Sequence, residues 1–97
     1  MIQRKGRMAG VVLSPATPVQ NIKYILSLID MVLIMTVNPG EKNQVFLFDM
    51  INKIKEVSEL LKDKNIDIEV DGSIDDKTAV LCQAAGANIF CIWWIYI

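Results

Sequence analysis

The chain has 97 residues, of which 53% are hydrophobic and 22% are charged, with a formal net charge of −1 and no histidine. This composition predicts a single globular domain at most and excludes a disordered chain. The near-neutral charge argues against binding to nucleic acid or to a membrane surface, and the lack of histidine excludes His-based catalysis and His-rich metal sites within the chain.

Two cysteines, Cys82 and Cys91, share no motif and make no disulfide framework. We interpret both as small buried hydrophobic side chains in a reducing compartment. The N-terminal region does not resemble a secretion signal, and the longest apolar run, residues 89–97, has about half the length needed to cross a bilayer. The sequence therefore predicts a cytoplasmic protein without a membrane span.

Four β-like runs alternate with three helical patterns along the chain. The runs cover residues 10–14, 31–37, 66–70 and 88–92, and the second is apolar nearly throughout, as in a strand covered on both faces. Thr17 is expected to cap a first helix that begins at Pro18. A second apolar stripe extends over residues 47–61, and a third helix is expected from Asp75 or Asp76 to Ala85, with Gly86 at its end.

The resulting order, β-α-β-α-β-α-β, predicts a parallel sheet, because strands joined by single crossover helices pair in parallel. Function in such sheets is found at the carboxyl ends of the strands. These ends lie at residues 14–17, 36–40, 71–73 and 93–94. Asp71, which follows the third run, is therefore expected on the functional edge, with a helix cap as the alternative role.

The strand ends also carry a family resemblance. GVVLSPATPV, VLIMTVNPG, IEVDGS and AAGANIF occur in this order between residues 6 and 90. They resemble successive blocks of the ribulose-phosphate 3-epimerase family, and MTV and EVDGS are similar to its allulose-6-phosphate 3-epimerase branch. The resemblance implies a (β/α)8 TIM barrel, which has eight strands and roughly 250 residues. Residues 1–97 are then expected to form a single partial domain, the C-terminal half of the barrel, with about four parallel strands and three crossover helices.

The resemblance implies an isomerase of carbohydrate metabolism that inverts C3 of a ketose phosphate, either ribulose 5-phosphate or allulose 6-phosphate. Two acids exchange the C3 proton, and a divalent metal held by two histidines and two aspartates stabilises the enediolate. Zinc, manganese, iron and cobalt are the metals to consider. By this resemblance Asp71 is one acid/base and one metal ligand. The other ligands lie in strands that this chain lacks, so metal binding by the chain itself is expected to be weak or absent.

The same resemblance places further residues at the substrate. Met35 would line the pocket, and backbone groups of Asn38, Pro39, Gly40, Gly72 and Ser73 would surround the sugar phosphate. From the residues alone, Met35 would be a core side chain and residues 38–40 a turn.

Two departures from the family weaken the expected phosphate site. Glu41 and its neighbours replace a glycine-containing loop, and Trp93-Trp94-Ile95 replaces a small Gly-Ser or Gly-Thr-Ser end. The isolated chain is therefore expected to lack activity and to form homo-oligomers or aggregates through open strand edges. The alternative to an enzyme is a catalytically inactive remnant, at most an oligomerising structural piece.

Overall fold

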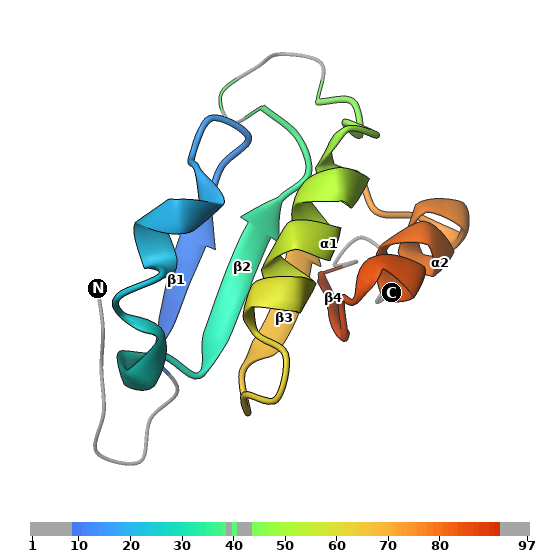
Figure 1. Ribbon diagram of the computed structural model, residues 1–97. Helices are drawn as coiled ribbons and strands as arrows, with labels where there is room; N and C mark the ends of the chain where they lie inside the picture. Colours follow the sequence, from blue (N-terminus) through green and yellow to red (C-terminus); the bar gives the residue numbers. More distant parts are fainter. Residues whose placement is uncertain (1–8, 39, 41–43, 92–97) are drawn as a thin grey trace.

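The computed structural model describes residues 9–38, 40 and 44–91, and its elements follow one another in a β/α order (Figure 1). The four strands are β1 Gly10–Leu13, β2 Met31–Met35, β3 Asp67–Asp71 and β4 Ile89–Cys91. The helices are two 3-10 segments, η1 Val19–Ile22 and η2 Leu26–Leu28, and two α-helices, α1 Met50–Leu60 and α2 Asp76–Ala85. No helix in this part of the chain is long and apolar enough to cross a membrane.

All four strands are parallel and lie in one open sheet in the order β1-β2-β3-β4. Each strand therefore pairs with the next one along the chain, as in the wall of a barrel that has not closed. In register, Leu13 pairs with Ile34, and Met35 pairs with Asp71. The predicted partial barrel of four parallel strands is confirmed.

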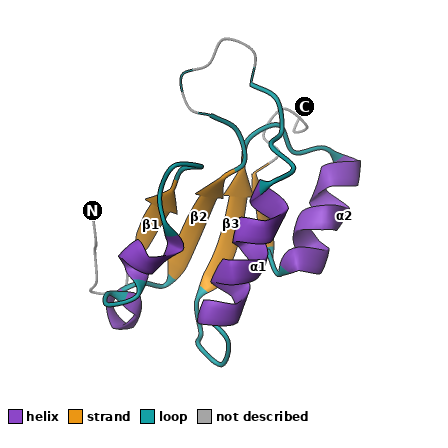
Figure 2. Ribbon diagram, turned by 45° about the horizontal axis from the view of Figure 1, so that its top comes forward, coloured by secondary structure: helices purple, strands orange, loops and turns teal. Residues whose placement is uncertain are grey.

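The helices of the described residues all lie on one face of this sheet (Figure 2). The side chains of β2 and β3 that point to this face are buried, and Ile34 and Val70 have no exposed surface. Ile54 and Val57 of α1, spaced three residues apart, meet them from the helix side and are equally inaccessible. The apolar stripe recognised along residues 47–61 is therefore the side of α1 that builds the core.

The first crossover differs from expectation, because η1 and η2 replace a single helix. Their backbone amides bond three residues back, as in Lys23 N–H to the Gln20 carbonyl at 3.1 Å and Leu28 N–H to the Ile25 carbonyl at 2.9 Å. The prediction that Thr17 caps this helix is wrong, because Pro18 occupies the N-cap position of η1 and no side chain makes a cap hydrogen bond there.

The ends of α2 follow the sequence signals. The Asp75 side chain accepts from the backbone amides of Lys77 at 3.0 Å and Thr78 at 2.8 Å, and the Thr78 hydroxyl bonds back to Asp75 in a capping box. Gly86 ends the helix with a φ of 127°, and a side chain there would collide with Ser58 of α1. This glycine therefore permits α1 and α2 to pack closely.

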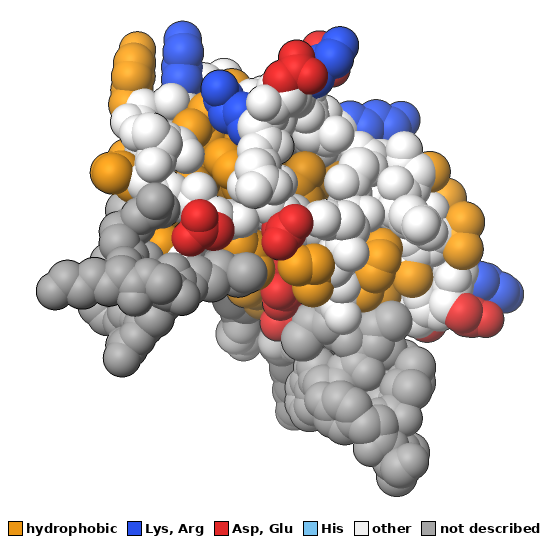
Figure 3. All heavy atoms as spheres, turned by 90° about the horizontal axis from the view of Figure 1, so that it is seen from below, with side chains coloured by type: hydrophobic (Ala, Val, Ile, Leu, Met, Phe, Trp, Pro, Cys, Tyr) orange, Lys and Arg blue, Asp and Glu red, His pale blue; other side chains and the backbone are white. Residues whose placement is uncertain are grey.

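Charged groups are mixed on the surface at the amino ends of the strands. In the view from this side, Lys side chains lie scattered among acidic and uncharged groups (Figure 3). The coloured part of this face therefore has no single broad basic area of the kind that phosphate backbones favour.

Candidate functional site

Asp71 is the last residue of β3 and lies at the carboxyl edge of the sheet. Burial alternates along this strand, with Ile68 and Val70 buried against the helices and Asp71 half-buried. Because successive side chains of a strand point to opposite faces, Asp71 lies on the face that carries no helix. Met35 ends β2 directly opposite Asp71 and is also half-buried. The structure thus brings these two predicted site residues together.

Thr36 fixes the backbone on which Asp71 is mounted. It is fully buried, and its amide donates to the Asp71 carbonyl at 2.9 Å. Its hydroxyl oxygen lies 3.1 Å from the Asp71 carbonyl oxygen and 2.6 Å from the Gly72 carbonyl oxygen, so its single hydrogen is shared between the two acceptors, with Gly72 the nearer. Thr36 is part of the MTV motif, but no role is predicted for it from the sequence alone. Its position directly after an apolar strand could have indicated one, because a buried hydroxyl needs a hydrogen-bond partner.

Gly72 and Ser73 turn the chain sharply after Asp71. Both have positive φ, 129° at Gly72 and 54° at Ser73. A Cβ on Gly72 would lie 2.9 Å from Cγ2 of Val37 and 3.0 Å from the Thr36 hydroxyl oxygen. Glycine is therefore required here by both conformation and space. The Ser73 hydroxyl donates to the Gln44 carbonyl at 2.6 Å, which joins this turn to the segment that follows β2.

The other predicted substrate residues lie after β2. Asn38 is half-buried, whereas Gly40 is exposed and has a φ of 84° with open space around it. Pro39 lies outside the described residues, as do Glu41 and the Trp93-Trp94-Ile95 end, so both departures from the family fall there. Among the predicted site residues that the structure describes, Met35, Asp71, Gly72 and Ser73 form one continuous group at the carboxyl edge.

A second carboxylate lies on the same face as Asp71, and sequence reasoning missed it. Glu69 is two residues earlier on β3, at the spacing that returns a side chain to one face. Partial burial and the negative charge of Asp71 raise the pKa of the Glu69 carboxyl. Asp71 does not cap a helix, because Asp75 performs that function and its hydrogen bonds with Thr78 lower the pKa of the Asp75 carboxyl.

A metal ion would need more ligands than this edge provides. Among the described residues, no three or more Cys, Asp or Glu side chains gather as a metal site would require. Asp71 is thus a single candidate ligand, and these residues do not fit a metal ion by themselves. Cys82 is fully buried, and desolvation raises the pKa of its thiol to about 11, so it is a core side chain as predicted. The side chain of Cys91 lies outside the described residues.

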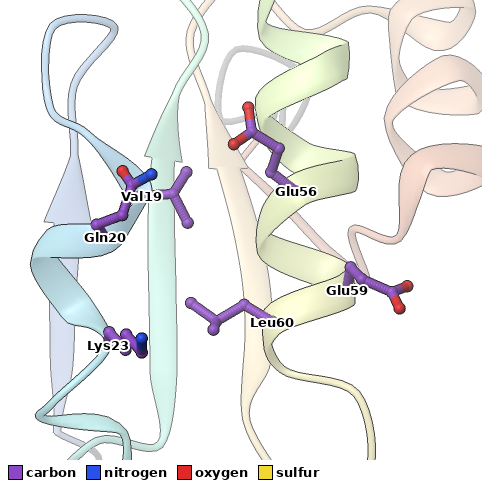
Figure 4. Close-up of a pocket in the computed structure, with 6 residues that line it drawn as sticks. All are labelled: Val19, Gln20, Lys23, Glu56, Glu59 and Leu60. Carbon is purple, nitrogen blue, oxygen red and sulfur yellow. The ribbon is translucent and has the colours of Figure 1, made fainter.

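A pocket of about 320 Å³ lies on the helical side of the sheet, between η1 and α1 (Figure 4). Val19 and Leu60 extend from η1 and α1 into the space between these elements, while Glu59 points away from it (Figure 4). None of the predicted site residues lines this pocket. The carboxyl edge with Asp71 and the pocket are therefore separate features on different sides of the sheet.

Comparison with known proteins agrees with the strand-end motifs. The model of the ribulose-phosphate 3 epimerase family matches residues 1–93. The ribulose-phosphate 3-epimerase of Bacillus subtilis (strain 168) is 46% identical over 92 residues, which are 92% of this chain and 42% of that protein. The enzyme of Rhodobacter capsulatus is 39% identical over 89 residues, which are 92% of this chain and 39% of that protein.

The chloroplastic ribulose-5-phosphate-3-epimerase of Arabidopsis thaliana is 42% identical over 89 residues, which are 90% of this chain and 32% of that protein. The chain therefore spans less than half the length of these curated relatives. The matched residues include every described strand and helix. The chain belongs to the ribulose-phosphate 3-epimerase family.

Proposed function

We propose that the chain supplies the C-terminal half of a ketose-phosphate 3-epimerase barrel, with Asp71 as one of its two acid/base groups. The supporting observation is the placement of Asp71 at the carboxyl edge, on the sheet face without helices. In a closed barrel this face becomes the interior, and the carboxyl edge becomes the end where TIM-barrel chemistry occurs. Residues 1–97 then act as a single partial domain.

In this proposal the Asp71 carboxylate removes the proton from C3 of the substrate, next to the ketone. The electron pair of the broken C–H bond forms the enediolate, and an acid on the opposite face returns a proton to C3 with inverted configuration. Thr36 holds the backbone of Asp71 through its amide and hydroxyl, so the carboxylate starts from a fixed strand end. A divalent metal would need ligands from beyond the described residues, and no step here is routed through it.

The proposed substrate is a sugar phosphate, either ribulose 5-phosphate or allulose 6-phosphate. Met35 pairs with Asp71 and would line the sugar pocket. Gly72 and Ser73 follow directly on the same edge, and Asn38, Pro39 and Gly40 would contribute the wall after β2. Turns of this kind, with positive φ and bare backbone, permit close approach of a phosphate to amide groups.

A second candidate function is a non-catalytic piece that associates with other chains. It is favoured by the open sheet, in which β1 and β4 are the outermost described strands and each has one unpaired edge. Val12 of β1 is 58% exposed although it lies in a strand. Unpaired edges and an uncovered apolar face promote association. A homo-oligomer of the isolated chain is the expected form.

An epimerase assay on two proteins tests the catalytic proposal. One is the 97-residue chain, and the other joins it to the part of the Bacillus subtilis relative that it does not match. Both receive each sugar phosphate and a divalent metal. The joined protein is expected to turn over substrate, and Asp71→Asn is expected to abolish turnover with the fold retained, because Asn cannot accept the proton. Activity of Asp71→Asn within a few fold of the parent would refute the role of Asp71.

Light scattering coupled to size-exclusion chromatography tests the second candidate on the isolated chain. A dimer or larger species at micromolar concentration is expected, and Val12→Lys is expected to shift it toward monomer by placing charge on the open face. Tyr24→Lys is the matched control, because Tyr24 is 87% exposed and lies between η1 and η2. A clean monomer of the parent chain would contradict association through this face.

A further inference from the structure

The loop after β1, residues 14–17, is closed by its own hydrogen bonds. The Thr17 amide donates to the Ser14 carbonyl at 3.0 Å, and the Ser14 amide donates to the Thr17 hydroxyl at 3.2 Å. The two hydroxyl oxygens of Ser14 and Thr17 lie 2.8 Å apart. The amides and hydroxyls of Ser14 and Thr17 are thus partnered within the turn, and the carbonyls of the turn can accept further hydrogen bonds.

Lys53 of α1 donates to three of these carbonyls. Its ammonium nitrogen lies 3.1 Å from the Ser14 carbonyl oxygen, 3.0 Å from that of Pro15 and 2.6 Å from that of Thr17. An ammonium group has three N–H donors, so each donor has one carbonyl. The three carbonyls come from a stretch of four residues and converge on a single cation. We call this arrangement the Lys53 clasp.

The clasp is unlike the usual behaviour of a surface lysine. Lys53 is half-buried, whereas Lys55, two residues along the same helix, is exposed. Ordering a long lysine side chain costs conformational entropy, and charge-assisted hydrogen bonds can outweigh that cost. The clasp also links residues far apart in sequence, since Lys53 follows Ser14 by 39 positions. It therefore ties helix α1 to the end of β1, across the strand β2 that lies next to β1.

We propose that Lys53 is a positioning residue that fixes the loop at residues 14–17 against α1. This loop continues β1 at the carboxyl edge, and the neighbouring β2 ends at Met35, which pairs with Asp71. By holding the loop, the ammonium sets one border of the edge on which Asp71 lies. The significance of that border for substrate rests on the proposed function, but the clasp itself does not.

Hydrogen exchange on the full 97-residue chain tests the clasp. In Lys53→Met the stem is kept and the ammonium is lost, so the Thr17 amide is expected to exchange about tenfold faster or more, as loss of charged hydrogen bonds implies. The Asp67 amide, which bonds to the Asp30 carbonyl at 2.9 Å, is the internal reference and is expected to be unchanged. Lys55→Met, on the same helix, is expected to alter neither amide.

Two results would overturn the proposal. One is an unchanged Thr17 exchange rate in Lys53→Met, which would mean that the ammonium does not hold the loop. The other is equal acceleration at Thr17 and Asp67, which would mean that the substitution loosens the whole sheet. Neither readout depends on turnover, so failure of the clasp and failure of the epimerase proposal are distinguished.

Chemical rescue separates the ammonium from the packing of the stem. In Lys53→Cys, the thiolate displaces bromide from 2-bromoethylamine and gains an ammonium at nearly the length of lysine. Iodoacetamide gives the same cysteine a neutral amide instead. The first reagent is expected to restore slow Thr17 exchange and the second is not, with the parent chain treated alike to account for Cys82 and Cys91. Equal protection after the two reagents would show that charge plays no part and would refute the clasp.

Discussion

The two faces of the sheet are built from alternate residues of the same strands, yet their environments differ. On the helical face, Val32 and Ile34 of β2 and Val70 of β3 have no exposed surface. On the opposite face, Leu33, Glu69 and Asp71 are half-buried, and Val12 is 58% exposed. Burial of apolar side chains on the first face stabilises the folded state. The second face combines apolar and acidic groups, so burial there contributes little to the free energy of folding.

This difference separates the residues of β3 that stabilise the fold from the residue proposed to act on substrate. Ile68 and Val70 anchor β3 to the helices, and Asp71 is positioned by that anchoring without needing burial itself. A carboxylate on the helical face would be desolvated and costly. On the helix-free face the Asp71 side chain remains partly exposed to solvent.

Substitution on each face should expose the difference most clearly. Ile54→Ala, on the helical side, is expected to lower the free energy of unfolding by about 2–5 kcal/mol, because it opens a cavity in a site with no exposed surface. Leu33→Ala, on the other face, is expected to cost about 1 kcal/mol, since that side chain is only half-buried. Urea unfolding measures both, and equal losses would remove the distinction between the faces.

The turn after β3, at the carboxyl edge of the sheet, should also be sensitive to substitution. Gly72→Ala is expected to destabilise the chain by about 1–3 kcal/mol, because φ is 129° and the new Cβ would lie 2.9 Å from Val37 Cγ2. Gly40→Ala is the matched control, with a φ of 84° and no atom within 4 Å of the new Cβ. Urea midpoints that shift equally for the two variants would mean that the contact with Val37 is unimportant.

The smallest expected effect concerns the charge on the helix-free face. Because folding raises the Glu69 pKa above its ordinary value of 4.5, protonation stabilises the folded state and ionisation destabilises it. Stability from this group is therefore full below the ordinary pKa and falls as pH rises through the raised value. Glu69→Gln should be slightly more stable than the parent at pH 7, with the difference shrinking toward pH 4. If the difference in free energy of unfolding between Glu69→Gln and the parent stayed constant from pH 4 to pH 7, the raised pKa of Glu69 would be contradicted.

The local elements could be predicted because their signals lie close together in sequence. Alternating or continuous apolar runs marked the four strands to within about two residues, and Asp75 and Gly86 marked the ends of α2. The strand-end position of Asp71 followed from the same pattern. The form of the first crossover did not, because apolar spacing alone does not distinguish one α-helix from two 3-10 segments, of which only the first buries Val19 and Ile22.

Only the tertiary structure decided the contacts that hold the edge in place. Thr36 reaches the carbonyls of Asp71 and Gly72 because β2 and β3 pair in one register, and a shift of one residue would break both bonds. The Lys53 ammonium reaches the carbonyls of the loop after β1 because α1 packs on the sheet near that loop. Short-range periodicity fixes which face a residue occupies, but hydrogen bonds between residues 35 to 39 positions apart depend on packing that no local pattern records.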